Sequence, residues 1–176
     1  MFKKALITLA VVLVIFSAVV AMQPNEFKLS RSTSIAAAPA KIFAVVNNIH
    51  RWNDWSPWAK SDPSAKYIFE GPEKGVGAAQ SWSGPKTGEG KMTLSLSQPS
   101  KKIEFQLEFY KPFKGSNLIE FTFQPEGKST QVTWAMSGKN NFIAKTMNLL
   151  VGMEKMLGPM FDQGLLNLKT MVESKN

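Results

Sequence analysis

Cysteine is absent from this 176-residue chain, and histidine occurs once, as His50. Without cysteine the chain forms no disulfide, has no thiolate nucleophile and has no cysteine-based metal site. A single imidazole also excludes a metal site built from several histidines. The sequence therefore predicts neither a metal ion nor another cofactor.

Acidic residues are scarce: 13 Asp and Glu stand against 21 Lys and Arg, which gives a formal net charge of +8. No run of five like charges occurs, so the basic excess is diffuse. Nucleic-acid binding usually needs a more concentrated basic footprint. We therefore expect no nucleic-acid partner, and the sequence leaves the oligomeric state open.

The sequence also lacks a recognisable catalytic set. His50 adjoins Arg51 at a predicted helix end, where a cation is favoured, and no Ser-His-Asp arrangement can be assigned. Asp54 and Asp62 flank a tryptophan-rich segment, and we expect both to be solvated. The glycines between residues 71 and 90 match neither a phosphate loop nor a dinucleotide fingerprint and are typical of hairpin turns. We predict no catalytic residue.

Residues 5–22 form an uncharged hydrophobic run of 18 residues. As a helix this run would extend ~27 Å at ~1.5 Å per residue, close to the ~30 Å thickness of a bilayer core. Lys3 and Lys4 precede it, which predicts a cytoplasmic N-terminus and a domain on the outer, periplasmic or extracellular side. We predict that residues 1–22 are a membrane anchor whose lipid-facing side chains include Leu6, Leu9, Val12, Leu13, Ile15 and Phe16. The alternative is a signal peptide cleaved after the small residues 19–21, which would give a secreted protein.

A short linker at residues 23–26 precedes the domain, which we place at residues 27–176. The alternation of residues 27–35 predicts a strand. A helix is predicted to open at Pro39 and to end between Asn47 and Asn53. Period-two alternation then favours about six antiparallel strands with one solvated face, separated by turns rich in glycine and proline.

An apolar stripe at helical spacing from Asn141 to about Glu173 predicts a long C-terminal helix. We expect Gly158 and Pro159 to bend or interrupt this helix, because proline removes a backbone hydrogen bond. The order of elements predicts an α+β fold, in which a curved antiparallel sheet of six to seven strands wraps round the helix. Such a sheet need not close fully on the helix, so an apolar cavity can remain between them.

We expect side chains from both the sheet and the helix to line this cavity. The methionines of the helix suit a tolerant apolar ligand site, although apolar residues at helical spacing are also typical of a plain core. The predicted lining consists of Trp82, Met92, Leu94, Phe105, Leu107, Phe121, Trp134, Met153, Met156 and Met160.

Trp52, Trp55 and Trp58 are spaced three residues apart around Pro57. Pro57 pushes the preceding residue out of the helical region, so one regular helix cannot carry all three indoles. A turn must therefore hold them, either as a stacking platform for a ligand or as a plug for one end of the core. We favour the plug.

Three segments together resemble the START-like helix-grip superfamily: AAAPAKIFAVVNNIHRWNDWSPW at residues 36–58, GVGAAQSW at 75–82 and MLGPMFDQGLLNLK at 156–169. More narrowly, the chain resembles SRPBCC proteins of the polyketide cyclase/dehydrase and lipid transport type, many of which carry a membrane segment before the domain. The resemblance covers residues 27–173. It implies a ligand cavity between sheet and helix, but no shared catalytic motif accompanies the fold.

These observations favour a membrane-tethered, exported domain that binds a hydrophobic small molecule or lipid without chemistry. One alternative is a cyclase or dehydratase that positions a polyketide with Tyr67, Tyr110 or Arg51. Another is an interaction module with a filled interior that binds an envelope protein. Phe113, in the loop KPFKG, could insert into an anionic membrane, but we expect it to pack on its own domain.

Overall fold

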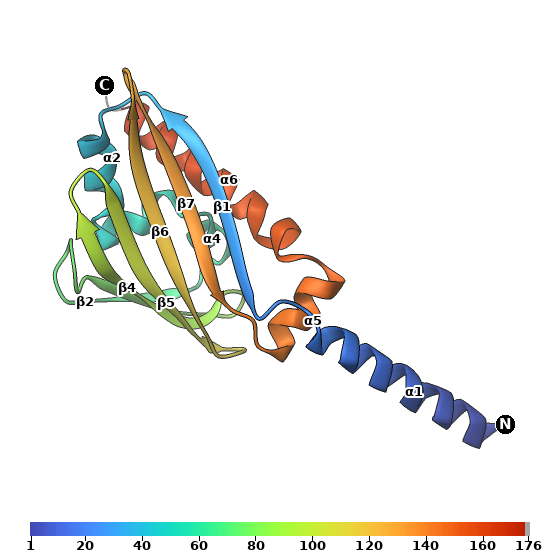
Figure 1. The fold of residues 1–176 in the computed structure, drawn as a ribbon. Helices are drawn as coiled ribbons and strands as arrows, with labels where there is room; N and C mark the ends of the chain where they lie inside the picture. Colours follow the sequence, from blue (N-terminus) through green and yellow to red (C-terminus); the bar gives the residue numbers. More distant parts are fainter. Residues whose placement is uncertain (175–176) are drawn as a thin grey trace.

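The structure, a computed structural model, describes residues 1–174, so the last two residues of the predicted domain lie outside the described residues. An N-terminal helix that projects from the rest of the chain precedes a mixed domain that ends in a long helix (Figure 1). The elements are α1 (Phe2–Ala21), β1 (Glu26–Ile35), α2 (Pro39–Val46), the 3-10 turn η1 (Ile49–Arg51), α3 (Trp52–Trp55), α4 (Pro57–Ser61), β2 (Lys66–Glu70), β3 (Ala79–Gly84), β4 (Gly88–Gln98), β5 (Lys102–Lys111), β6 (Gly115–Glu126), β7 (Ser129–Lys139), α5 (Phe142–Leu150) and α6 (Met153–Glu173).

The seven strands form one antiparallel sheet in the order β1-β7-β6-β5-β4-β3-β2. Strands β2 to β7 follow one another as a meander, and β1 joins the sheet beside β7. The alternation predicted for β5 is confirmed: Ile103, Phe105 and Leu107 are buried, while the intervening side chains are partly exposed. One face of the sheet is thus apolar, as period-two alternation requires.

Helix α6 packs its apolar side against this face, close to β1 and β7. Phe161, Leu165 and Leu168 are buried, and the Phe161 ring lies 4.3 Å from that of Trp134 on β7, measured between ring centroids. Gly164 permits this approach, because an added Cβ would lie 2.6 Å from the Trp134 ring. The predicted α+β helix-grip architecture is therefore confirmed.

The interruption of the C-terminal helix lies earlier than predicted. Helix α5 ends at Leu150, and Gly152, at φ +85°, separates it from α6. Glycine reaches this backbone conformation without the steric cost that a side chain imposes. Helix α6 instead continues through Pro159, so of the two outcomes predicted at Gly158–Pro159, a bend or an interruption, the interruption is wrong.

The apolar stripe of the C-terminal segment is not buried along its whole length. Most of the large apolar side chains of α5 are exposed, whereas the apolar residues from Phe161 onward are mostly buried. The exposed set in this segment consists of Phe142, Ile143, Met147, Leu149, Leu150 and the adjoining Val151.

Candidate functional site

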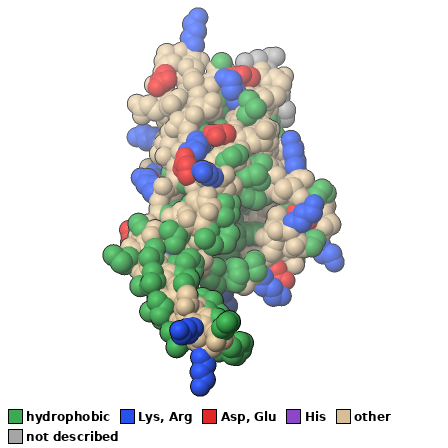
Figure 2. All heavy atoms as spheres, turned by 90° about the vertical axis from the view of Figure 1, so that its right-hand side faces the viewer, with side chains coloured by type: hydrophobic (Ala, Val, Ile, Leu, Met, Phe, Trp, Pro, Cys, Tyr) green, Lys and Arg blue, Asp and Glu red, His purple; other side chains and the backbone are tan. Residues whose placement is uncertain are grey.

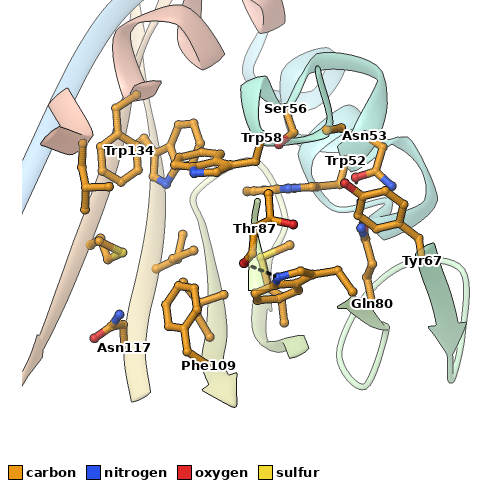
Figure 3. Close-up of a pocket in the computed structure, with 18 of the residues that line it drawn as sticks. Trp52, Asn53, Ser56, Trp58, Tyr67, Gln80, Thr87, Phe109, Asn117 and Trp134 are labelled. Atoms are coloured by element: carbon orange, nitrogen blue, oxygen red, sulfur yellow. Dashed lines mark hydrogen bonds between the residues drawn. The ribbon is translucent and has the colours of Figure 1, made fainter. Parts of the chain in front are cut away.

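A cavity of about 300 Å³ lies between the apolar face of the sheet, the short helices α3 and α4, and the first turns of α6 (Figure 3). Every strand except β1 contributes to its wall. The lining residues are Trp52, Asn53, Ser56, Trp58, Ala59, Tyr67, Gln80, Trp82, Thr87, Met92, Leu107, Phe109, Asn117, Ile119, Trp134, Met136, Met156, Leu157 and Phe161.

The structure divides the predicted cavity residues into three groups. Trp82, Met92, Leu107, Trp134 and Met156 line the cavity. Three others are fully buried in the solid core and do not reach it, namely Leu94, Phe105 and Phe121. The remaining two, Met153 and Met160, are half-buried on α6 and are not part of the lining.

The tryptophan segment packs the core and also lines the cavity. Ser56, in an extended conformation, separates α3 from α4, so Pro57 begins a new helix as its fixed geometry favours. Trp55 is fully buried and packs edge-on against Trp134, with ring centroids 5.6 Å apart. Trp52 and Trp58 also contact Trp134 but line the cavity as well. The cluster thus packs the core, and two of its three indoles also form part of the cavity wall.

Apart from Tyr67, which the cyclase alternative named, sequence reasoning did not predict the polar part of the lining, which comes from Asn53, Ser56, Gln80, Thr87 and Asn117 (Figure 3). Gln80 lies two residues before Trp82 on β3 and therefore on the same, inward-facing side of the strand. A polar residue at such a position is the signal that could have identified it. Its side-chain nitrogen donates to Asn53 Oδ1 at 3.0 Å, while its oxygen is buried without a partner among the described residues.

The indole N–H of Trp134 is a second buried group without a partner among the described residues. Burying an unpaired donor or acceptor is costly, so both groups favour an additional hydrogen-bonding partner. Both residues line the cavity, but these two polar atoms are themselves buried, so the cavity surface of each residue comes from its other atoms. No Asp, Glu, Lys, Arg or His occurs among the described lining residues.

The residues considered for catalysis do not converge. Tyr67 lines the cavity, and burial raises the pKa of its hydroxyl above the ordinary value. Tyr110 is exposed, and Arg51 pairs with Asp54 at 3.5 Å outside the lining. The His50 ring stacks on Phe69 and is likewise not part of the wall.

The expectation that Asp62 is solvated is wrong, because this residue is only 1% exposed. Its carboxylate accepts hydrogen bonds from the backbone N–H groups of Lys86 and Thr87, both at 2.9 Å, and from the hydroxyls of Ser64 and Thr87. Burial disfavours the charged form, but these bonds outweigh it and hold the pKa at about 2. Asp62 thereby fixes the β3–β4 turn.

That turn forms one side of the cavity. Thr87 lines it, and the Thr87 carbonyl accepts a hydrogen bond from the Trp82 indole at 3.2 Å (Figure 3). A carboxylate outside the lining therefore positions two residues of the wall.

The N-terminal helix and the loop between β5 and β6 lie apart from the cavity wall. Helix α1 has a mean hydropathy of 2.6 and is long and apolar enough to cross a membrane or to act as a signal sequence. Phe113, in the loop, is exposed, so the expectation that it packs on its own domain is wrong.

The model of the polyketide cyclase/dehydrase and lipid transport family matches residues 26–173. The chain belongs to this family. No match was found among curated proteins.

Solved structures with the same fold are distant in sequence. Protein MLL2253 from Mesorhizobium loti has a TM-score of 0.62 at 17% identity, over 85% of this chain and 99% of that chain. The Aha1 dimer from Colwellia psychrerythraea has a TM-score of 0.60 at 17% identity, over 84% and 96%. Protein CV1439 from Chromobacterium violaceum has a TM-score of 0.59 at 15% identity, over 85% and 99%. At these identities the similarity concerns the fold alone.

Proposed function

We propose that this family member is a membrane-tethered domain that binds a hydrophobic small molecule or lipid in its cavity and performs no chemistry on it. The observation that carries the proposal is an apolar cavity of about 300 Å³ without a charged residue in its described lining. Ligand pockets are typically apolar cavities of about 300–1,000 Å³ with a few polar groups that fix orientation.

The lining also indicates the class of ligand. Because no charged side chain faces the cavity, the enclosed part of the ligand is neutral: an unpaired charge there would lose its hydration. The polar side chains of the lining, such as Asn53, Thr87 and Asn117, offer hydrogen-bonding groups that could orient a ligand. A mainly apolar molecule that carries a hydroxyl or carbonyl group matches this arrangement.

An enzyme of the cyclase or dehydratase type is less well supported. General acid–base catalysis needs titratable groups that converge on the reacting atoms. Of the three candidate residues only Tyr67 lines the cavity, and burial raises the pKa of its hydroxyl, which keeps it neutral. An interaction module with a filled interior has less support still, since the described interior is not filled.

Tethering by α1 is supported by its contact with the domain. Val20, near the end of α1, is fully buried, and Lys145 Nζ on α5 donates to the Ala21 carbonyl at 3.1 Å. Cleavage after Ala21 would remove both contacts. The two lysines before the apolar run favour a cytoplasmic N-terminus and a domain on the outer side of the membrane.

Native mass spectrometry of the full chain, purified from membranes in mild detergent and offered a lipid mixture, tests the binding proposal. Met156→Trp should block the cavity and reduce ligand adducts at least several-fold. Met156 is 41% exposed and lies at the cavity rim, so the fold should tolerate the larger ring.

Leu166→Trp is the matched control, because Leu166 lies on the same helix, is 54% exposed and does not line the cavity. The control should retain the adducts of the unaltered chain. Equal amounts of ligand adduct in the two variants would count against binding in the cavity. So would the absence of adducts from the unaltered chain and from both variants.

A further inference from the structure

Helix α5 presents an apolar surface that no other described element covers. Among described residues 23–174, twelve large hydrophobic residues are exposed, and six of them fall within residues 142–151. Figure 2 shows hydrophobic side chains that follow α1 and continue above it beside a hollow in the surface. Contiguous apolar patches of this kind mark protein or membrane contacts.

The patch is joined directly to the end of the membrane helix. Helix α5 contacts α1, and the buried Lys145 ammonium donates to the Ala21 carbonyl at the end of α1, where a cation complements the helix dipole. The linker is fixed as well, since Asn140 donates to the Pro24 carbonyl at 3.0 Å. The patch therefore begins where α1 leaves the bilayer proposed above.

The loop with Phe113 belongs to the same surface. Asn141 caps α5 by accepting from the Ala144 N–H at 2.8 Å, and its side-chain nitrogen donates to the Lys114 carbonyl at 3.2 Å. The exposed Phe113 ring is thus tied to the first turn of α5.

The charges near the patch suit a lipid surface. The chain has no acidic residue between Glu108 and Glu120 or between Glu126 and Glu154. These two stretches contain the loop and α5, with Lys114 and Lys139 as nearby basic residues, whereas Lys111 pairs with Glu89 at 3.0 Å and the Lys145 ammonium is bound to the Ala21 carbonyl. Lysines beside an apolar helical face attract anionic head groups, at about 1 kcal/mol per residue near the surface.

We propose that α5, with the Phe113 loop, lies in the interface of the membrane that α1 enters and holds the cavity mouth beside the lipids. Met156 links the two sites, because it follows α5 closely in the chain, is exposed and lines the cavity. The ligand then enters from the bilayer rather than from water. This inference rests on the proposed function for its ligand, but the docking of α5 is tested separately.

The absence of cysteine permits single-site labelling of the full chain. Leu150→Cys and Ile68→Cys, at positions 66% and 64% exposed, would carry an environment-sensitive fluorophore in vesicles of phosphatidylcholine and phosphatidylglycerol. The label at position 150 should emit at shorter wavelength and be quenched several-fold more by lipids that are spin-labelled in the upper acyl chain. The label at 68, on the edge strand β2, should be quenched mainly by aqueous iodide.

Equal lipid quenching at both positions would overturn the inference. So would a label at 150 that is shielded from lipid and iodide alike, because a second copy or another protein would then cover α5. Leu150→Glu should slow ligand uptake from vesicles several-fold, whereas Ile68→Glu should not. If the lipid quenching at 150 occurs but no ligand is taken up by the unaltered chain, the proposed function fails while the docking of α5 stands.

Discussion

At the scale of single residues, Asp62 shows how a group outside the cavity can shape it. Its carboxylate holds the turn that supplies Thr87 to the lining. Asp62→Asn removes the charge that these donors stabilise, so we expect it to lower the thermal midpoint and loosen this part of the wall.

The effect of Asp62→Asn should depend on pH. The folded-state pKa of about 2 lies below the ordinary value of 3.8, so the carboxylate stabilises the fold above pH ~4 and loses this contribution as the pH falls toward 2. Thermal unfolding of the full chain in detergent should show a large difference between variant and unaltered protein at neutral pH and a small one near pH 2. Asp54→Asn, at an exposed ion pair with Arg51, is the control and should change little at any pH. A difference in unfolding temperature between Asp62→Asn and the unaltered protein that stays constant from neutral pH to pH ~2 would contradict the low pKa of Asp62.

At the scale of secondary structure elements, Gly164 sets the distance between α6 and the sheet. Gly164→Ala should gain ~1 kcal/mol of helix propensity but place a methyl group 2.6 Å from Trp134 and 3.2 Å from Pro57. Overpacking of this kind costs ~1–3 kcal/mol, so we expect a net loss of stability on the order of 1 kcal/mol.

Gly158→Ala is the matched control on the same helix. Its added methyl group would meet only the flexible end of Arg31, whose partners are Glu154 and Asp162 near the surface. We expect this variant to be as stable as the unaltered protein or slightly more stable. Denaturation curves should distinguish Gly164→Ala from Gly158→Ala. An equal loss of stability in both variants would show that the contact with Trp134 does not limit how closely α6 approaches the sheet.

The elements also show what the sequence can predict. Alternation along β5 correctly indicated which face is apolar, because the period of a strand is fixed by its backbone. It could not separate Phe105 from Leu107, which share that face: the first is buried in the core and the second lines the cavity. Whether an inward side chain meets a neighbour or a void depends on the curvature of the sheet, and no local pattern encodes that.

The sequence predicted the extent of the C-terminal helix well, but it did not predict where the helix is interrupted. Pro159 favoured an interruption because proline breaks most helix interiors. Its missing hydrogen bond is nevertheless tolerated within α6. Gly152 ends α5 through a positive φ, which composition alone does not indicate. The stripe on α5 resembled a core-facing stripe because an amphipathic helix has the same pattern whether it faces a protein core or a membrane.

At the scale of the whole molecule, the account depends on α1 remaining attached. The intact mass of the protein isolated from membranes should correspond to the full chain of 19.5 kDa. A mature N-terminus at Met22 would instead identify a cleaved signal peptide and a secreted domain, and it would remove the contact between Ala21 and Lys145.

The central claim is that a hydrophobic ligand occupies the interior, and the tryptophans provide a direct probe of it. Trp52, Trp58, Trp82 and Trp134 line the cavity, and the fifth, Trp55, contacts Trp52 with ring centroids 4.6 Å apart. A brominated acyl ligand with a hydroxyl or carbonyl group, titrated into the full chain, should quench most of the indole emission. The quenching should saturate at one ligand per chain. Emission that stays unchanged, or that falls linearly without saturation, would contradict a ligand site in this cavity.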